Sequence, residues 1–218
     1  MKWWAGALLL LLVLAGCRPQ PEQQTLAGPA SPEDVIFADD FSPATVGKWQ
    51  LEGDERGQSL LQDGQLIIEV NDANTVQYVA LAEQSFANFA LEVDATLLAG
   101  STDSTYGVLF RMPGPDQFYR FDITGNGLFV VERYDEGGGW TRLTDDWQES
   151  ALLHQGVNAT NRLGVLVVGG TFNFYANGEL LLQLADARYS GGAIALDAGT
   201  YGQPGLRVAF DNLVVSQP

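Results

Sequence analysis

The chain of 218 residues has one cysteine, one histidine and few basic residues. One cysteine excludes an intramolecular disulfide and a cysteine-based zinc site, and one histidine, His154, excludes metal sites that need two. The 11 Lys and Arg stand against 27 Asp and Glu, which gives a net charge of −16. Because phosphate binding needs clustered Lys and Arg, this balance argues against nucleic acid as a partner. An anionic lipid surface is disfavoured for the same reason.

The chain opens on an apolar run that is shorter than the roughly 20 residues of a membrane-spanning helix. Lys2 precedes the run, and Leu14-Ala15-Gly16-Cys17 ends it. This pattern is typical of a cleaved targeting segment, and LAGC resembles the bacterial lipobox. The resemblance implies cleavage before Cys17 and lipidation of its sulfur; an ordinary secretory signal or an uncleaved anchor is the alternative. We therefore expect an extracytoplasmic lipoprotein, held to the cell surface or outer membrane by its lipid alone.

Three segments follow from this pattern. Residues 1–16 form the signal peptide, and residues 17–32 form the lipidated cysteine and a flexible linker that lacks hydrophobic periodicity. Residues 33–218 carry strand patterns throughout and no internal linker. They are enough for one domain with a two-sheet core.

Period-two alternation predicts strands in this domain. Apolar residues at 89, 91, 93, 95 and 97 alternate with residues of another face, and the same holds at 66–70 and 119–123. The segment 163–168 is apolar on both faces, which is typical of a central strand. Asn126-Gly127 and Asn177-Gly178 each separate two such runs and predict hairpins. The best candidate for a short helical turn is 146–153.

The order of these signals resembles a known superfamily. The chain reads DDFS at 39–42, FALEVDATL at 89–97, YGVLFR at 106–111, FYRFDI at 118–123 and FDNLVVS at 210–216. This resembles the concanavalin A-like lectin/glucanase superfamily, with laminin G-like jelly rolls and 3-keto-disaccharide hydrolase-type domains as the nearest types. The resemblance implies an all-β, two-sheet antiparallel jelly-roll sandwich over nearly all of 33–218. The fold hosts lectins, glycosidases, adhesion modules and spacers, so it leaves function open.

The glycosidase motif of this superfamily is incomplete here. The laminarinase-type enzymes carry E-x-D-x-x-E on one strand, and its two Glu side chains act as nucleophile and acid/base. Glu92 and Asp94 match the first two positions, whereas Leu97 stands at the third and cannot donate a proton. This favours a protein that is not an enzyme. His154 lacks a G-x-S-x-G partner motif and is expected to be solvated or structurally hydrogen-bonded.

Arginine, carboxylate and aromatic residues cluster between residues 106 and 147, as in many sugar sites. Sugars stack on aromatic rings and hydrogen-bond to planar polar groups. Tyr106 is expected in a nearby loop, and loop tryptophans that only plug the sandwich edge are the alternative. The ligand-binding candidates are Arg111, Arg120, Asp122, Glu132, Arg133, Trp140 and Trp147.

Alternation places Tyr119, Phe121 and Ile123 in the core and Arg120 and Asp122 on the opposite face. A charged pair is costly when it is buried without partners, so this face is predicted to be wet or to form a polar groove. Under that hypothesis, Arg120→Ala abolishes glycan binding and leaves the fold intact. A salt-bridged outer face without a ligand is the alternative.

Calcium is the cofactor to consider, because it prefers carboxylate and carbonyl oxygens. The first and last strands usually pair in this fold, which would bring Asp39 and Asp40 near Asp211 and Asn212. An acidic solubilising surface is the alternative.

Three classes of function remain at this stage. The first is a lipid-anchored, non-catalytic carbohydrate-binding module, expected to be a monomer with a glycan or polysaccharide partner. The second is a glycan-active hydrolase or lyase with an atypical site. The third is a structural or protein-interaction domain at the cell surface. The cluster of arginine and aromatic residues favours the first.

Overall fold

The computed structural model describes residues 1, 31–43 and 47–218. Cys17 and the signal segment lie outside the described residues, so their processing stays a prediction. Within the described part, no helix is long and apolar enough to cross a membrane. The strands are β1 (Val35–Asp39), β2 (Gly53–Asp54), β3 (Gly57–Gln62), β4 (Gln65–Val70), β5 (Val76–Ala80), β6 (Phe89–Ala99), β7 (Thr105–Gly114), β8 (Gln117–Thr124), β9 (Leu128–Asp135), β10 (Gly139–Arg142), β11 (Gln148–Glu149), β12 (Thr160–Val168), β13 (Thr171–Ala176), β14 (Glu179–Ala185), β15 (Ala193–Gly199) and β16 (Leu206–Ser216).

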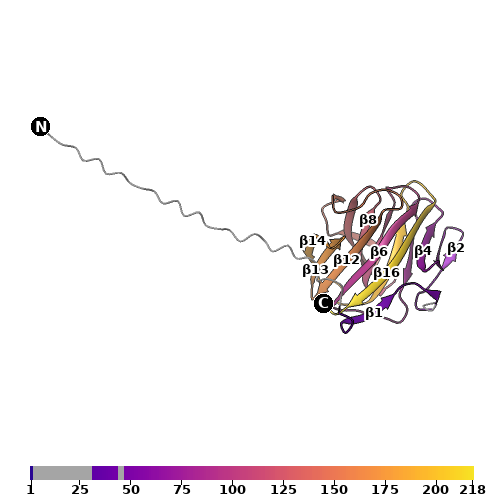
Figure 1. The fold of residues 1–218 in the computed structure, drawn as a ribbon, viewed down its shortest axis with the longest axis horizontal. Helices are drawn as coiled ribbons and strands as arrows, with labels where there is room; N and C mark the ends of the chain where they lie inside the picture. Colours follow the sequence, from indigo (N-terminus) through magenta and orange to yellow (C-terminus); the bar gives the residue numbers. More distant parts are fainter. Residues whose placement is uncertain (2–30, 44–46) are drawn as a thin grey trace.

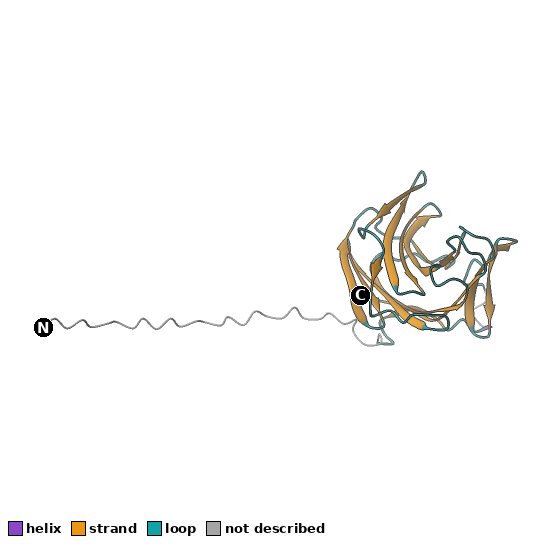
Figure 2. Ribbon diagram, turned by 90° about the horizontal axis from the view of Figure 1, so that it is seen from above, coloured by secondary structure: helices purple, strands orange, loops and turns teal. Residues whose placement is uncertain are grey.

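These strands form two antiparallel sheets. A nine-stranded sheet has the order β14-β13-β12-β6-β16-β4-β3-β2, with β1 paired to β16. A seven-stranded sheet has the order β10-β9-β8-β7-β15-β5, with β11 paired to β9. Figure 1 shows the nine-stranded sheet in front, and Figure 2 shows that both sheets are curved. The predicted all-β, two-sheet antiparallel jelly-roll sandwich is confirmed.

The alternating residues fill the space between the sheets. On β6 every second side chain from Phe89 to Leu97 is fully buried, as the period-two pattern predicts. Phe110 and Tyr119 of the seven-stranded sheet contact Phe172 of the facing sheet, with ring centroids 4.8–5.4 Å apart. The core is therefore rich in aromatic contacts, each of which adds about 0.5–1.5 kcal/mol beyond area burial.

The predicted hairpins form, with one difference in detail. Asn177 and Gly178 connect β13 to β14 and both have positive φ (54° and 85°), as a type I′ turn requires. Residues 125–127 connect β8 to β9, so that loop has three residues rather than two. The helical turn predicted at 146–153 is reduced to one turn at 150–153, where the N–H of Leu153 donates to Ser150 O at 3.3 Å. Before that turn, Gln148 and Glu149 form β11, which pairs with β9 and is therefore extended.

Candidate functional site

The face of the seven-stranded sheet that points away from the core carries two buried carboxyl groups. Asp197 on β15 lies opposite Gly107 on β7, and Gly107 lies opposite Asp122 on β8. Both aspartates are fully buried. Because Gly107 has no side chain, the middle strand leaves room between them. Burial, and then the charge of Asp122, raise the pKa of Asp197 well above its ordinary value, which favours its protonated form.

Arg120 on β8 holds this group of carboxyls together. Its guanidinium forms an ion pair with Asp122, with Nε 2.7 Å from Oδ2, and lies 3.3 Å from Asp197 and 3.9 Å from Glu132. It also donates to Thr105 Oγ1 at 2.8 Å. Burial alone would lower the pKa of Arg120, but the charge of Asp122, and after it the neighbouring Asp197, raise that pKa, so the guanidinium stays charged.

Arg120 is only 3% exposed. The prediction that it faces away from the core is confirmed. Of the two expectations for this face, a wet pair with Asp122 is wrong because both side chains are buried, whereas Arg120 does line a hollow. The reason for the burial is Asp197, which arrives from β15 and supplies a second buried partner. The first role of this guanidinium is therefore structural: it supplies the counter-charge for buried carboxyl groups.

A hollow of about 560 Å³, which we call the basin, lies over this part of the sheet. Two aromatic side chains are open to solvent in its lining: Trp140 on β10 is 48% exposed, and Tyr201, just after β15, is 50% exposed. The guanidinium of Arg120 lies 5.3 Å from the Trp140 ring. The basin is lined by Asn74, Val76, Arg120, Glu132, Trp140, Arg142, Gly199, Thr200 and Tyr201.

A smaller apolar pocket of about 180 Å³ adjoins the basin and shares Trp140 with it. In its lining, the rings of Phe118, Tyr134 and Trp140 contact one another with centroids 4.8–5.8 Å apart. The lining also includes the apolar residues Val76, Tyr78, Leu109 and Pro115, together with Arg120 and Asp197. The site thus combines aromatic surface with polar groups, an arrangement typical of small-molecule pockets.

Arg111 does not belong to this site. A register shift after Phe110 and a φ of 47° turn Arg111 out of the alternating pattern of β7. Its side chain is 2% exposed and donates to the carbonyl oxygens of Ala87, Gly169 and Tyr189 at 2.6–3.1 Å. Its role is to tie three connecting segments together.

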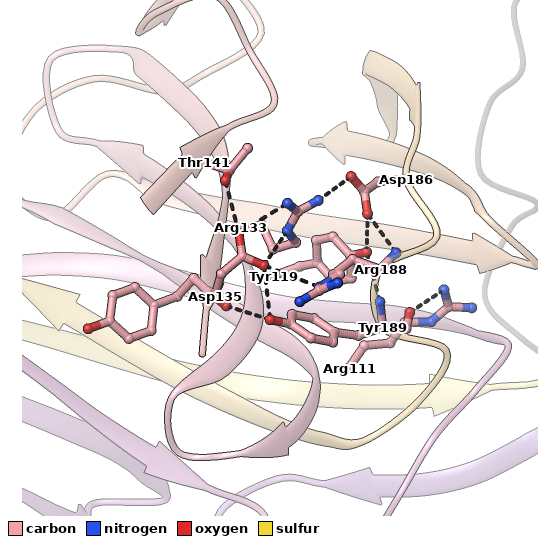
Figure 3. A network of polar contacts seen from close by, with 9 residues as sticks. Arg111, Tyr119, Arg133, Asp135, Thr141, Asp186, Arg188 and Tyr189 are labelled. Carbon is pink, nitrogen blue, oxygen red and sulfur yellow. Dashed lines mark hydrogen bonds and ion pairs between the residues drawn. The ribbon is translucent and has the colours of Figure 1, made fainter. Parts of the chain in front are cut away.

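Arg133 lies in a separate polar network, shown in Figure 3. It donates to Asp135 at 2.8 Å and to Asp186 at 2.5 Å, and Tyr119 also donates to Asp186. The hydrogen bond from Arg133 lowers the pKa of Asp135 to about 2. Arg133 has the core-facing parity of β9, because its neighbours Glu132 and Tyr134 face the other way. It therefore fastens the segment that leads from β14 to β15.

Two aromatic candidates also separate from the basin. Tyr106 is fully buried on β7 within the core, and the expected loop position is wrong. Trp147 is half-buried beside a different hollow, next to Tyr201. Of the seven ligand-binding candidates, Arg120, Glu132 and Trp140 line the basin, and Asp122 lies next to Arg120.

The predicted calcium ligands do not converge. The first and last strands pair as expected, with Asp39 opposite Leu213. However, Asp39 is buried and accepts a hydrogen bond from Trp49 Nε1 at 3.0 Å, while Asp211 accepts from the main-chain N–H of Asn212. Asp40 is exposed. In residues 31–43 and 47–218, no group of three or more His, Cys, Asp or Glu side chains could hold a metal ion.

The residues of the incomplete glycosidase motif lie on the other sheet. Glu92 and Asp94 on β6 pair with Arg162 on β12 at 3.1 Å and 3.3 Å, and Leu97 is buried in the core. The ring Nδ1–H of His154 donates to the carbonyl oxygen of Thr160 at 2.9 Å, a structural role as expected. These residues do not share a surface with the basin.

Two residues of the site were missed at the sequence level. Asp197 lies in AIALDAG, where a single charge within an apolar run is the available signal. Tyr201 lies in a short loop and has no motif around it. Both residues reach the site because β15 lies between β5 and β7 in the sheet: Asp197 is on β15, and Tyr201 comes just after it.

Comparison with known proteins supports the fold strongly and the function less. No family model and no curated protein matches the sequence. Among solved structures, the carbohydrate-binding module CBM66 from Bacillus subtilis has 15% identity and a TM-score of 0.64, covering 78% of this chain and 96% of its own. A protein of unknown function with a galectin-like fold from the same organism has 13% identity and a TM-score of 0.65, with 84% and 96% covered. The laminarinase catalytic domain from Thermotoga maritima has 11% identity and a TM-score of 0.59, with 84% and 98% covered.

These likenesses and the two antiparallel sheets show that the chain has the concanavalin A-like sandwich fold. Its structural neighbours include proteins that bind glycans and proteins that cleave them. At these identities the fold is shared, and the chemistry of the site has to be argued from the residues of this chain.

Proposed function

We propose that this protein is a non-catalytic carbohydrate-binding module whose ligand occupies the basin. The observation that carries the proposal is the pair of open aromatic rings, Trp140 and Tyr201, in the lining of a hollow that also contains charged groups. A sugar can stack its C–H face on such a ring while its hydroxyl groups meet Glu132, Arg142 and Asn74. The structural likeness to a carbohydrate-binding module supports this.

The charges of the basin favour a neutral sugar. Arg142 already pairs with Glu132 at 3.4 Å and with Asp146 at 2.5 Å, and Arg120 is paired with its own carboxylates. An acidic sugar would therefore find no cation without a partner among the described residues that line the basin. It would also approach a protein of net charge −16.

The placement of carboxylates argues against hydrolysis. A retaining or inverting glycosidase needs two carboxyl groups that flank the scissile bond. Glu132 is the one carboxylate among the described residues that line the basin, and it is already ion-paired. A glycan-active enzyme remains the second candidate, because the laminarinase catalytic domain shares the fold.

Binding can be tested with a glycan array that carries neutral and acidic oligosaccharides. We expect neutral glycans to bind, and Trp140→Ala to weaken binding about tenfold or more through loss of the stacking surface. Leu180→Ala is the control, because Leu180 is also exposed but lies on β14 of the other sheet. If the Trp140→Ala variant binds as tightly as the wild type, the glycan binds outside the basin. If the wild type releases reducing sugar from a glycan, the protein is a glycan-active enzyme.

We also propose that Cys17 carries the lipid that anchors the module on the extracytoplasmic side of a membrane. The lipobox resemblance and the chain's single cysteine support this. Acyl chains bind a bilayer by about 0.8 kcal/mol per buried CH₂ group, so two or more chains give a stable anchor. In cell fractionation, Cys17→Ser is expected to move the protein out of the membrane fraction. Unchanged membrane retention and processing would contradict the anchor.

A further inference from the structure

A second hollow adjoins the basin at Tyr201. It has a volume of about 220 Å³ and lies beside the loop between β8 and β9, and we call it the rim hollow. Tyr201 belongs to the lining of both hollows. The rim hollow is lined by Asp103, Thr124, Asn126, Leu128, Trp147 and Tyr201.

Tyr201 is held in place by its neighbours. The main-chain N–H of Thr200 donates to Thr75 O at 3.0 Å, and its hydroxyl donates to Asp72 O at 2.7 Å. On the other side, the N–H of Gly202 donates to Asn74 Oδ1 at 3.0 Å. The backbone on both sides of Tyr201 is thus anchored to one loop, while half of the side chain stays exposed. Its side chain lies between the two hollows, because it belongs to the lining of both.

The rim hollow has the chemistry of a sugar subsite. The half-buried indole of Trp147 supplies an aromatic surface. Asn126 donates to Asp103 Oδ1 at 2.7 Å, and both residues are exposed. This bond uses one of the two amide hydrogens and one of the two carboxylate oxygens, which leaves a donor and an acceptor for ligand hydroxyl groups.

We propose that the rim hollow is a second sugar subsite, and that the ligand is a neutral oligosaccharide of two or more units that passes over Tyr201 from the basin. The inference rests on the proposed function of the basin. It adds a length requirement: only a ligand long enough to pass Tyr201 from the basin reaches the rim hollow, where its next unit gains contacts with Trp147 and Asn126.

The tryptophan indoles allow each hollow to be observed separately. In NMR spectra of the purified full chain, Trp140 reports on the basin and Trp147 on the rim hollow, once both signals are assigned with Trp140→Phe and Trp147→Phe. Trp49 is the internal reference, because its indole is buried and donates to Asp39. The probes are ladders from monosaccharide to hexasaccharide of glucan, galactan, mannan and fructan.

We expect the monosaccharide of the binding ladder to shift the Trp140 signal alone, and members long enough to pass Tyr201 to shift Trp147 as well. Affinity should rise about tenfold between these lengths, and Trp147→Ala should remove the rise while leaving monosaccharide binding unchanged. If long members shift Trp140 but never Trp147, the second subsite is wrong and the basin stands. If no probe shifts either indole, the proposed function itself fails, and the subsite with it.

Discussion

Replacing Arg120 with alanine is expected to lower the free energy of unfolding by about 3–5 kcal/mol, because the change strands buried carboxyl groups without a counter-charge. Arg120 is 3% exposed and faces Asp122, Asp197 and Glu132, of which the two aspartates are fully buried. The expectation that this substitution leaves the fold intact is therefore replaced by the opposite one. Chemical denaturation measures the difference directly.

Arg162→Ala is the matched control. Arg162 also pairs with two carboxylates, Glu92 and Asp94, but its side chain is 37% exposed on the face of β12. Exposed pairs of this kind contribute about 0–1 kcal/mol. A loss of similar size in both variants would mean that burial does not set the strength of the Arg120 pairs.

The pH dependence identifies the cause of the loss. In the Arg120→Ala variant, stranded carboxyl groups bind protons more tightly in the folded chain than in the unfolded one. A raised pKa in the folded state gives stability that is present at low pH and lost as the pH rises. The difference in the free energy of unfolding between the Arg120→Ala variant and the wild type should therefore become smaller at mildly acidic pH. A gap that stays constant with pH would point to lost packing instead of stranded charge.

Much of the fold follows from local pattern. Period-two alternation assigns Phe121 to the core and Arg120 to the opposite face, and Asn-Gly pairs fix the hairpins. Such signals act over a few residues, so they are readable in the chain itself. The resemblance in the order of motifs then indicates how the strands are arranged as two sheets.

The site depends on contacts that no local pattern carries. Asp197 reaches Arg120 across 77 positions of the chain, because β15 is inserted beside β7. The sequence identifies Arg120 as facing away from the core but does not reveal that Asp197 is its buried partner. Tyr201 follows β15 closely in the chain, so the position of β15 beside β7 also brings Tyr201 to the basin.

Two other ligand-binding candidates, Arg133 and Arg111, lie outside the site. The sequence pattern could have excluded the first of them but not the second. The parity of β9 already separates Arg133 from Glu132, since adjacent residues on a strand face opposite sides. Arg111 has the parity of Leu109 and should share its face. A bulge after Phe110 reverses this, and bulges leave little trace in a single sequence.

Gly107→Ala is expected to lower the free energy of unfolding by about 3 kcal/mol or more, because the new methyl group has no space. A Cβ atom on Gly107 would lie 2.0 Å from the carbonyl oxygen of Phe121 and 2.6 Å from Asp122 Oδ1. The first contact is backbone on the neighbouring strand, so relief requires β7 and β8 to separate. The second would push the Asp122 carboxylate away from Arg120.

Gly114→Ala is the control on the same strand, since a Cβ atom there meets nothing within 4 Å. It is expected to change the free energy of unfolding by about 0.5 kcal/mol or less. Equal stability of the two variants would show that β7 and β8 can move apart freely. The expected difference would instead show that the missing side chain at Gly107 makes room for Asp122 and Asp197, and that this room lets Arg120 remain buried and charged beneath the basin.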